Sequence, residues 1–415
     1  MKNFILVSFL ASIFLNTTAQ VVEDSISMGP NYTNDVYYSL NDGTVKEVGG
    51  ANWTVAFYNS AMSAAIMINE ARGVALWNAS ENTADFASIT DTTGLSTWTQ
   101  LHDEDSTWDA YSAFEDDALG GNANYGWGEY NFTTHLISAS RVFVLKTIDE
   151  RFFKVMVVQK ETGTFTYRYA SLDNSFDTTM LIYPADMLDR NYAYLNMDNH
   201  TLLDIEPNNN NWDIVFNKYS TDLGFAFYPV TGVQLNVGVQ VAKILGEEVS
   251  SASYLGETFL PNKNIIGYDW KYLIGNMPPY YLVDSLTYFI KTNNDDIYKL
   301  YFTAFEGGST GKVKFNKEFI TNITSIVDLN EVNIASIYPN PCRTKANVLI
   351  QADKNTKVSV EIYSVLGNLQ YQNKLDLNAG LNDLSLDLTN YENGLYLVQI
   401  IEGNTRKTEK LIVNH

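Results

Sequence analysis

The chain carries one stretch twice, as Asn52-Trp53-Thr54-Val55-Ala56-Phe57-Tyr58-Asn59 and as Asn211-Trp212-Asp213-Ile214-Val215-Phe216-Asn217-Lys218-Tyr219. A second repeated stretch precedes each copy, at 36–44 and at 193–201, and a third follows, at 141–155 and at 286–300. Repeated blocks in one order indicate two copies of a single structural unit. We place these copies at 21–180 and 181–325, with an insertion inside the first copy.

The residue pattern of both copies predicts antiparallel β-structure. Apolar runs at 142–146 and 153–158 flank a polar turn at 149–151, and the second copy repeats this arrangement, which is typical of a β-hairpin. Trp53, Val55 and Phe57 alternate, so they are expected to share one face of a strand. That stripe is interpreted as sheet core, with an aromatic ligand platform as the alternative.

The segment 334–415 differs from the rest in charge and in pattern. It holds eight basic and eight acidic residues, whereas 21–333 holds 18 basic and 40 acidic residues, a net charge of −22. Short alternating runs separated by turns predict about seven strands, which is typical of a small β-sandwich. The chain is therefore expected to be all-β, with two tandem units, a linker at 326–333 and a C-terminal β-sandwich.

The N-terminus and the overall composition narrow the possible functions. Lys2, the apolar run 4–15 and the small residues 17–20 predict a secretory signal peptide over 1–20. No later run is long and apolar enough to predict a transmembrane segment. The net charge of −21, from 27 basic and 48 acidic residues, argues against nucleic-acid binding. Cys342 is the only cysteine, which excludes an internal disulfide and zinc sites with several cysteines.

Four short blocks in the C-terminal segment carry a family resemblance. They are Ile-Tyr-Pro-Asn-Pro at 337–341, Val-Glu-Ile-Tyr-Ser-Val-Leu-Gly at 360–367, Gly-Leu-Tyr-Leu-Val at 394–398 and Lys-Leu-Ile-Val at 410–413. The segment resembles the type A C-terminal sorting domain of the type IX secretion system of Bacteroidetes. The resemblance implies passage through the periplasm, the secretion machinery as partner, and a final place on the outer cell surface or in the medium.

The duplicated unit also resembles a known family. The strand and turn at 37–43, the Asn-Trp strand at 52–57 and the Lys-Thr hairpin at 142–149 are similar to features of HmuY-like proteins, and the resemblance spans about 31–320 in two copies. These are surface or secreted haem-binding proteins of Bacteroidetes. The resemblance implies capture of haem, free or from a haemoprotein, with histidine or methionine as axial ligands.

Haem iron takes axial donors such as His or Met above an apolar cleft. His102 and His135 both lie in the insertion of the first copy and have aromatic neighbours, so they are the candidate axial pair. Met62, Met67 and Met277 are further candidate donors.

The acidic stretch that follows His102 suggests a second ligand. Asp103, Asp105 and Asp109 provide oxygen donors at alternating positions, as a calcium loop does. The stretch lacks the glycine and the late glutamate of an EF-hand, so a solvated acidic loop is the alternative interpretation.

No enzyme is predicted. Residues 307–311 match G-x-S-x-G, but they connect two predicted strands instead of a strand and a helix, as a nucleophile elbow requires. Two alternatives to haem capture stay open. One is a structural or adhesive surface protein, and the other is a glycan-binding module that uses Trp108, Tyr125 and Trp127.

Overall fold

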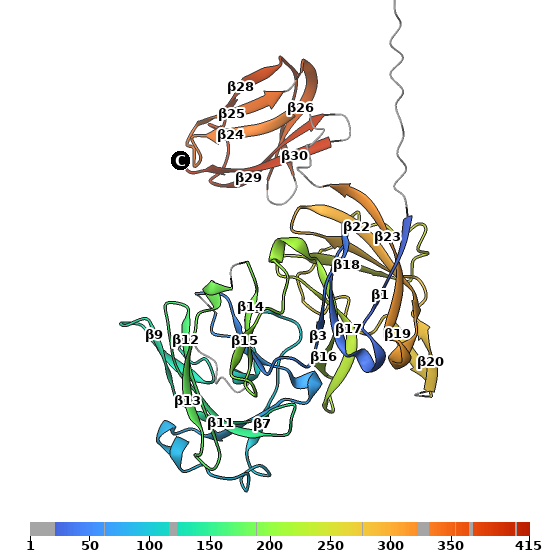
Figure 1. Cartoon of the computed structure of the whole chain (residues 1–415). Helices are drawn as coiled ribbons and strands as arrows, with labels where there is room; N and C mark the ends of the chain where they lie inside the picture. The colour runs from blue at the N-terminus through green and yellow to red at the C-terminus, as the bar shows by residue number, and fades with distance from the viewer. Residues whose placement is uncertain are drawn as a thin grey trace, which may run out of the picture. The chain divides into compact units, whose positions relative to one another are not determined.

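The computed structural model describes residues 21–61, 63–115, 123–187, 189–275, 277–322, 332–352, 354–364, 368–402 and 405–415. The predicted signal peptide and Met62 lie outside these ranges. The described residues form strands and short 3₁₀ turns with no α-helix, which confirms the all-β prediction. None of their helical turns has the length or apolarity to cross a membrane. They fall into two compact units, one up to Asn322 and one beyond it (Figure 1).

The first unit contains two sandwich-like lobes, each made of an outer and an inner sheet. In the first lobe the outer sheet has the order β13-β12-β11-β10-β6-β7, with β9 and β8 added beside β11, and the inner sheet has the order β15-β14-β4-β5. The strands of this lobe are β4 (Val55–Tyr58), β5 (Ile66–Ile68), β6 (Ala75–Ser80), β7 (Thr99–Leu101), β8 (Gly128–Asn131), β9 (Leu136–Ala139), β10 (Val142–Lys146), β11 (Phe152–Glu161), β12 (Thr164–Ser171), β13 (Asp177–Ile182), β14 (Tyr192–Asn196) and β15 (Thr201–Leu203).

The second lobe repeats this arrangement. Its outer sheet has the order β1-β23-β22-β21-β18, its inner sheet has the order β17-β16-β2-β3, and a separate hairpin is formed by β19 and β20. Its strands are β1 (Val21–Ser27), β2 (Asn34–Ser39), β3 (Gly43–Gly49), β16 (Ile214–Asp222), β17 (Phe227–Leu235), β18 (Gln240–Leu245), β19 (Lys271–Ile274), β20 (Met277–Leu282), β21 (Leu286–Lys291), β22 (Asp296–Phe305) and β23 (Lys312–Asn322). The 3₁₀ turns of the unit are η1 (Pro30–Tyr32), η2 (Glu70–Arg72), η3 (Thr83–Ala87), η4 (Ala113–Glu115), η5 (Pro184–Asp186), η6 (Asn209–Asn211) and η7 (Gly307–Ser309).

The two lobes exchange their opening strands. The first three strands of the chain, β1 to β3, complete the second lobe, while β13 to β15 complete the first. The register is the same in both places, because Tyr194 lies opposite Ala56 in the first lobe and Tyr37 lies opposite Val215 in the second. Strand pairing therefore crosses the predicted boundary at residue 180, and each lobe combines residues of both sequence copies (Figure 1).

The hairpins predicted from the polar turns are confirmed. Strands β10 and β11 pair with Phe143 opposite Val155, and β21 and β22 pair with Tyr288 opposite Leu300. Their turns also match, since Glu150 and Asp295 both have positive φ, near 60°. The strands β22 and β23 that flank residues 307–311 also pair as a hairpin, joined by η7.

Each lobe has its own buried core, and a third buried cluster lies between the inner sheets. Val55 and Phe57 are in the first core, and Ile214 and Phe216 are in the second, so these strand residues are sheet core as predicted. The prediction that the tryptophans share this face is wrong. The chain bends at Thr54 and Asp213, which breaks the alternation, and Trp53 and Trp212 join the cluster between the lobes.

The C-terminal unit is a small sandwich of seven described strands, as its sequence predicts. Three strands form one sheet in the order β24-β25-β28, and four form the other in the order β27-β26-β29-β30. Their bounds are β24 (Val332–Tyr338), β25 (Lys345–Ala352), β26 (Thr356–Ser364), β27 (Leu369–Leu377), β28 (Gly380–Asp387), β29 (Gly394–Glu402) and β30 (Thr405–Val413). Cys342 is buried in its core.

Candidate functional site

A cavity of about 80 Å³ lies between the inner sheets of the two lobes. We call it the inter-lobe cavity. Strands from both lobes line it, together with η2 and the segment 103–108. Its aromatic lining residues are Tyr37, Trp53, Trp108, Tyr192, Tyr194 and Tyr219, and its polar lining includes Asp35, Glu70, Asp103, Asp105, Asn217, Gln234 and Lys263.

Two equivalent Trp–Tyr pairs frame this region. Trp53 packs edge-on against Tyr194 with 5.2 Å between ring centroids, and Trp212 packs edge-on against Tyr37 at 4.9 Å. With the bend at residues 54 and 213, both indole rings lie outside the lobe cores, in the cluster between the inner sheets. The exchange of strands places each tryptophan beside a tyrosine of the other sequence copy.

Lys263 is buried against one aromatic wall. Its Nζ lies 4.0 Å from the Trp108 ring centroid and 3.9 Å from the Met67 sulfur, and the residue is 2% exposed. Burial lowers the pKa of this amine, against the opposing effect of Asp103 and Asp105. Trp108 is fixed in turn, because its Nε1 donates to the Leu235 carbonyl at 2.7 Å.

Asp103 is also buried, and its negative charge acts on the Lys263 amine. Its Oδ1 accepts from the Ala113 N–H at 2.7 Å, and its Oδ2 accepts from the Ile68 N–H at 2.9 Å. Burial raises the pKa of this carboxyl, although both hydrogen bonds favour the charged form. Asp103 thus connects the segment 103–108 to β5 and η4.

Four buried polar atoms around the inter-lobe cavity have no hydrogen-bond partner among the described residues. They are Glu70 Oε2, Asn217 Oδ1, Tyr219 Oη and Gln234 Nε2. Asn217 Nδ2 donates to Gln234 Oε1 at 2.9 Å, so this amide pair leaves one acceptor and one donor free. Buried polar groups in proteins are usually paired, so several unpaired ones around one cavity call for an explanation such as bound water or a ligand.

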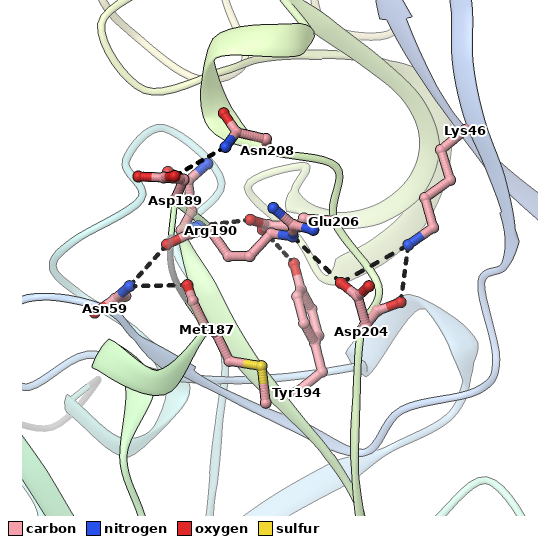
Figure 2. Close-up of polar contacts among 10 residues, drawn as sticks. Lys46, Asn59, Met187, Asp189, Arg190, Tyr194, Asp204, Glu206 and Asn208 are labelled. Atoms are coloured by element: carbon pink, nitrogen blue, oxygen red, sulfur yellow. Dashed lines mark hydrogen bonds and ion pairs between the residues drawn. The ribbon is translucent and has the colours of Figure 1, made fainter.

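A polar network beside the cavity holds the lobes together (Figure 2). Glu206 accepts from the Tyr194 hydroxyl and from the Asn191 N–H, both at 2.6 Å, and burial raises its pKa to about 7. Asp204 accepts from Arg190 Nε at 3.2 Å, and its carbonyl accepts from Lys46 Nζ at 2.9 Å. Lys46 belongs to the exchanged hairpin of the second lobe, so the network links β3 to the start of β14.

The two predicted haem histidines have different environments. Nδ1 of His102 lies 2.5 Å from Glu70 Oε1, and its ring stacks on Phe227 with 3.8 Å between centroids. His135 lies in the exposed turn between β8 and β9, with Nδ1 2.5 Å from the Tyr130 hydroxyl. Neither lines the inter-lobe cavity. The axial pair stays a prediction. His102 contacts residues of η2 and β17, whereas His135 contacts Tyr130 of its own hairpin.

The predicted methionine donors are spread over the unit. Met67 lines the inter-lobe cavity. Met277 begins β20, and its side chain, like the whole of Met62, lies outside the described residues.

The predicted calcium ligands are only partly together. Asp103 and Asp105 line the inter-lobe cavity, whereas Asp109 is exposed and is not among its lining residues. The described ranges contain no group of three or more His, Cys, Asp or Glu residues that could hold a metal ion. Calcium binding stays a prediction without a gathered site.

The three aromatic residues of the glycan hypothesis also separate. Trp108 lines the inter-lobe cavity, but Trp127 is fully buried in the first core and donates from Nε1 to the Ala64 carbonyl at 3.1 Å. Tyr125 packs against that core.

The residues that sequence analysis missed are Lys263, Asn217, Tyr219 and Gln234. They carry no local motif. Asn217, Tyr219 and Gln234 reach this region by strand pairing, and Lys263 reaches it from a turn, where its N–H donates to the Ser106 carbonyl at 2.8 Å.

Comparison with known proteins identifies the second unit. Residues 336–414 match the family model described as the secretion system C-terminal sorting domain. The C-terminal unit is a type IX secretion sorting domain. The protein is therefore exported to the outer cell surface or secreted, with the type IX machinery as its partner, as the sequence resemblance implies.

The other comparisons add no family for residues 21–322. No curated protein matches the chain. One solved structure that it is similar to is the dimeric latent PorU from Porphyromonas gingivalis, at 12% identity and a TM-score of 0.18 over 68% of this chain. The chain spans 32% of that protein's length. This similarity is too low to support an argument, and none of these findings supports the HmuY-like resemblance.

Proposed function

We propose that the protein is an exported binding protein that captures a small ligand in the inter-lobe cavity. The observation that carries the proposal is the set of four unpartnered buried polar atoms around one cavity, beside the buried amine of Lys263. An aromatic cavity with a few convergent polar groups is the usual form of a small-molecule site. The sorting domain delivers this site to the outside of the cell.

We favour binding over catalysis. The two oxygens of the Asp103 carboxylate are occupied by backbone N–H groups, and Glu206 is held by Tyr194 and Asn191. Carboxylates whose oxygens already accept hydrogen bonds within the fold hold neighbouring segments in place, and we do not assign them to acid–base catalysis. G-x-S-x-G lies in the η7 turn between β22 and β23, which is not the context of a nucleophile elbow.

Haem is a second candidate ligand for one reason, the position of Met67 in the cavity wall. A cavity of about 80 Å³ is small beside the roughly 300–1,000 Å³ of pockets for drug-sized ligands. Haem would therefore require the lobes to separate. Small polar ligands fit a cavity of this size better.

The test measures thermal unfolding of the exported protein with a panel of small sugars, amino acids, inorganic anions and hemin. The hemin samples are also titrated by absorbance in the Soret band. We expect a small polar member of the panel to raise the unfolding temperature and hemin to give no saturable Soret shift. A saturable Soret shift that Met67→Leu abolishes would make haem the ligand. No stabilisation by any member of the panel would reject the binding proposal.

A further inference from the structure

The free atoms of the inter-lobe cavity are a mixed set of donors and acceptors. Gln234 Nε2 and Tyr219 Oη can donate, and Asn217 Oδ1 and Glu70 Oε2 can accept. Gln234 is 2% exposed and Tyr219 is 7% exposed, so bulk water does not replace the missing partners. Burial raises the pKa of the Tyr219 phenol, which keeps it protonated as a donor. A hydroxyl group both donates and accepts, so it matches such a mixed set.

Five carboxylates and two lysines line the cavity, which disfavours an anionic ligand. Asp103 and Asp105 face an anionic ligand with like charge, and the whole chain carries −21. Lys263 repels a cationic ligand. Its Nζ also occupies the face of Trp108 that such a ligand would need, 4.0 Å from the ring centroid. Asp35 is not available to a cation either, since it is paired with Arg72 at 2.7 Å. A neutral ligand avoids the repulsion of the carboxylates and does not compete with Lys263 for the Trp108 ring or with Arg72 for Asp35.

The walls and size of the cavity indicate how such a ligand would fit. Trp53 and Trp108 are half-buried at the cavity and offer apolar ring surface to a partner. A volume of about 80 Å³ is several times the roughly 10–15 Å³ that a cavity needs to hold one water molecule. This space admits the hydroxylated edge of one sugar ring, whose C–H face would rest on an indole.

Building on the proposed binding function, we propose that the inter-lobe cavity recognises a neutral polyhydroxylated ligand, a monosaccharide or the terminal sugar of a glycan, through Gln234, Asn217 and Tyr219. Gln234 and Asn217 act as a joined amide pair, and Tyr219 supplies a hydroxyl. All three come from β16 and β17, so the second lobe provides the polar recognition. Met67 occupies the position in the first lobe that corresponds to Gln234, because it lies opposite Ala56 as Gln234 lies opposite Val215.

The experiment is calorimetric titration of the exported protein with neutral monosaccharides and their methyl glycosides. The comparison panel contains free amino acids and inorganic phosphate. Tyr219→Phe and Gln234→Met each remove one polar group with little change in volume. Thr287→Val is the matched control, because Thr287 Oγ1 is also buried without a partner but lies in β21, outside the cavity lining.

We expect a sugar to bind, with affinity reduced about ten-fold or more by each cavity variant and unchanged in Thr287→Val. Removal of an unpaired buried hydroxyl should also raise the unfolding temperature of ligand-free Tyr219→Phe by about 2–4 °C. Binding of an amino acid or phosphate instead of a sugar would overturn the ligand class and leave the binding function intact. If no sugar, amino acid or phosphate binds, both the ligand class and the binding function are overturned, and water is the only occupant of the cavity.

Discussion

Single buried ionisable residues give this protein a pH dependence opposite to that of ordinary ion-paired carboxylates. Glu206 is 1% exposed, and burial raises its pKa from 4.5 to about 7. Glu115 behaves in the same way, with a pKa of about 7, and Asp213 has a pKa of about 6. A folded state that holds a proton more tightly than the unfolded state loses stability as the pH rises from the unfolded to the folded pKa.

We therefore predict that the free energy of unfolding falls between pH 4.5 and pH 7, and that Glu206→Gln flattens this fall. The shift from 4.5 to about 7 corresponds to about 3 kcal/mol for this residue. Urea unfolding of the wild type and the variant at pH 5 and pH 8 measures the difference. Parallel pH profiles for the two proteins would contradict the assigned cause.

At the residue scale, the sequence predicts the strand cores but not the cavity. Val55, Phe57, Ile214 and Phe216 follow a period of two and are buried as this period requires. Trp53 and Trp212 do not follow this period, because the backbone bends just before each strand begins. The polar cavity residues carry no spacing signal, since residues about 100 or more positions apart meet only after the strands have paired.

At the scale of the element, strands β11 and β22 each carry a buried lysine that donates hydrogen bonds to the backbone of a loop. Lys154 in β11 is 0% exposed, and its Nζ donates to the Ile89 carbonyl at 3.1 Å and to Asn174 Oδ1 at 2.5 Å. The equivalent Lys299 in β22 donates to the carbonyls of Val249 and Ala252. The two lysines hold corresponding loops against the outer sheets.

We predict that Lys154→Met destabilises the protein by about 1.5–3 kcal/mol, because the Ile89 carbonyl loses a charged donor. Hydrogen exchange should increase in residues 81–98, the loop between β6 and β7. Lys146→Met is the control, since Lys146 makes an exposed ion pair with Glu150 and should cost little. Equal losses of stability in the two variants, or unchanged exchange in the loop, would argue against this role of Lys154.

Hairpins are predictable from this sequence, but their partners are not. Polar turns and alternating apolar residues locate β10–β11 and β21–β22 correctly. Strand β4 has two similar candidate partners, β2 and β14, and their stretches repeat each other at 36–44 and 193–201. Local pattern is the same for both, so the choice between them depends on the length and path of the connections.

At the scale of the whole molecule, the exchange of β1 to β3 makes the first unit resemble a dimer joined into one chain. The lobes have equivalent sheet orders and equivalent registers across their exchanged strands. Residues 50–54 connect β3 in one lobe to β4 in the other. Symmetric exchange of identical elements is a common route to two-fold dimers.

We predict that a fragment of residues 21–176, which carries β1 to β12, forms a two-fold dimer. Strand β4 of each copy lacks β14, and β2 lacks β16, so two copies can satisfy each other by placing β2 of one beside β4 of the other. Size-exclusion chromatography with light scattering should give twice the monomer mass, and the unfolding temperature should rise with protein concentration.

The register of the intact protein provides a covalent test of this dimer. Tyr37 and Tyr194 occupy equivalent positions, and Tyr194 lies opposite Ala56. In the fragment that carries both Tyr37→Cys and Ala56→Cys, oxidation should therefore join two different chains, and a gel without reductant should show a covalent dimer. Cys342 lies outside the fragment and does not compete. Oxidised monomers would mean that the hairpin folds back onto its own lobe, and the exchange would then be imposed by the second copy and not by the short connection at 50–54.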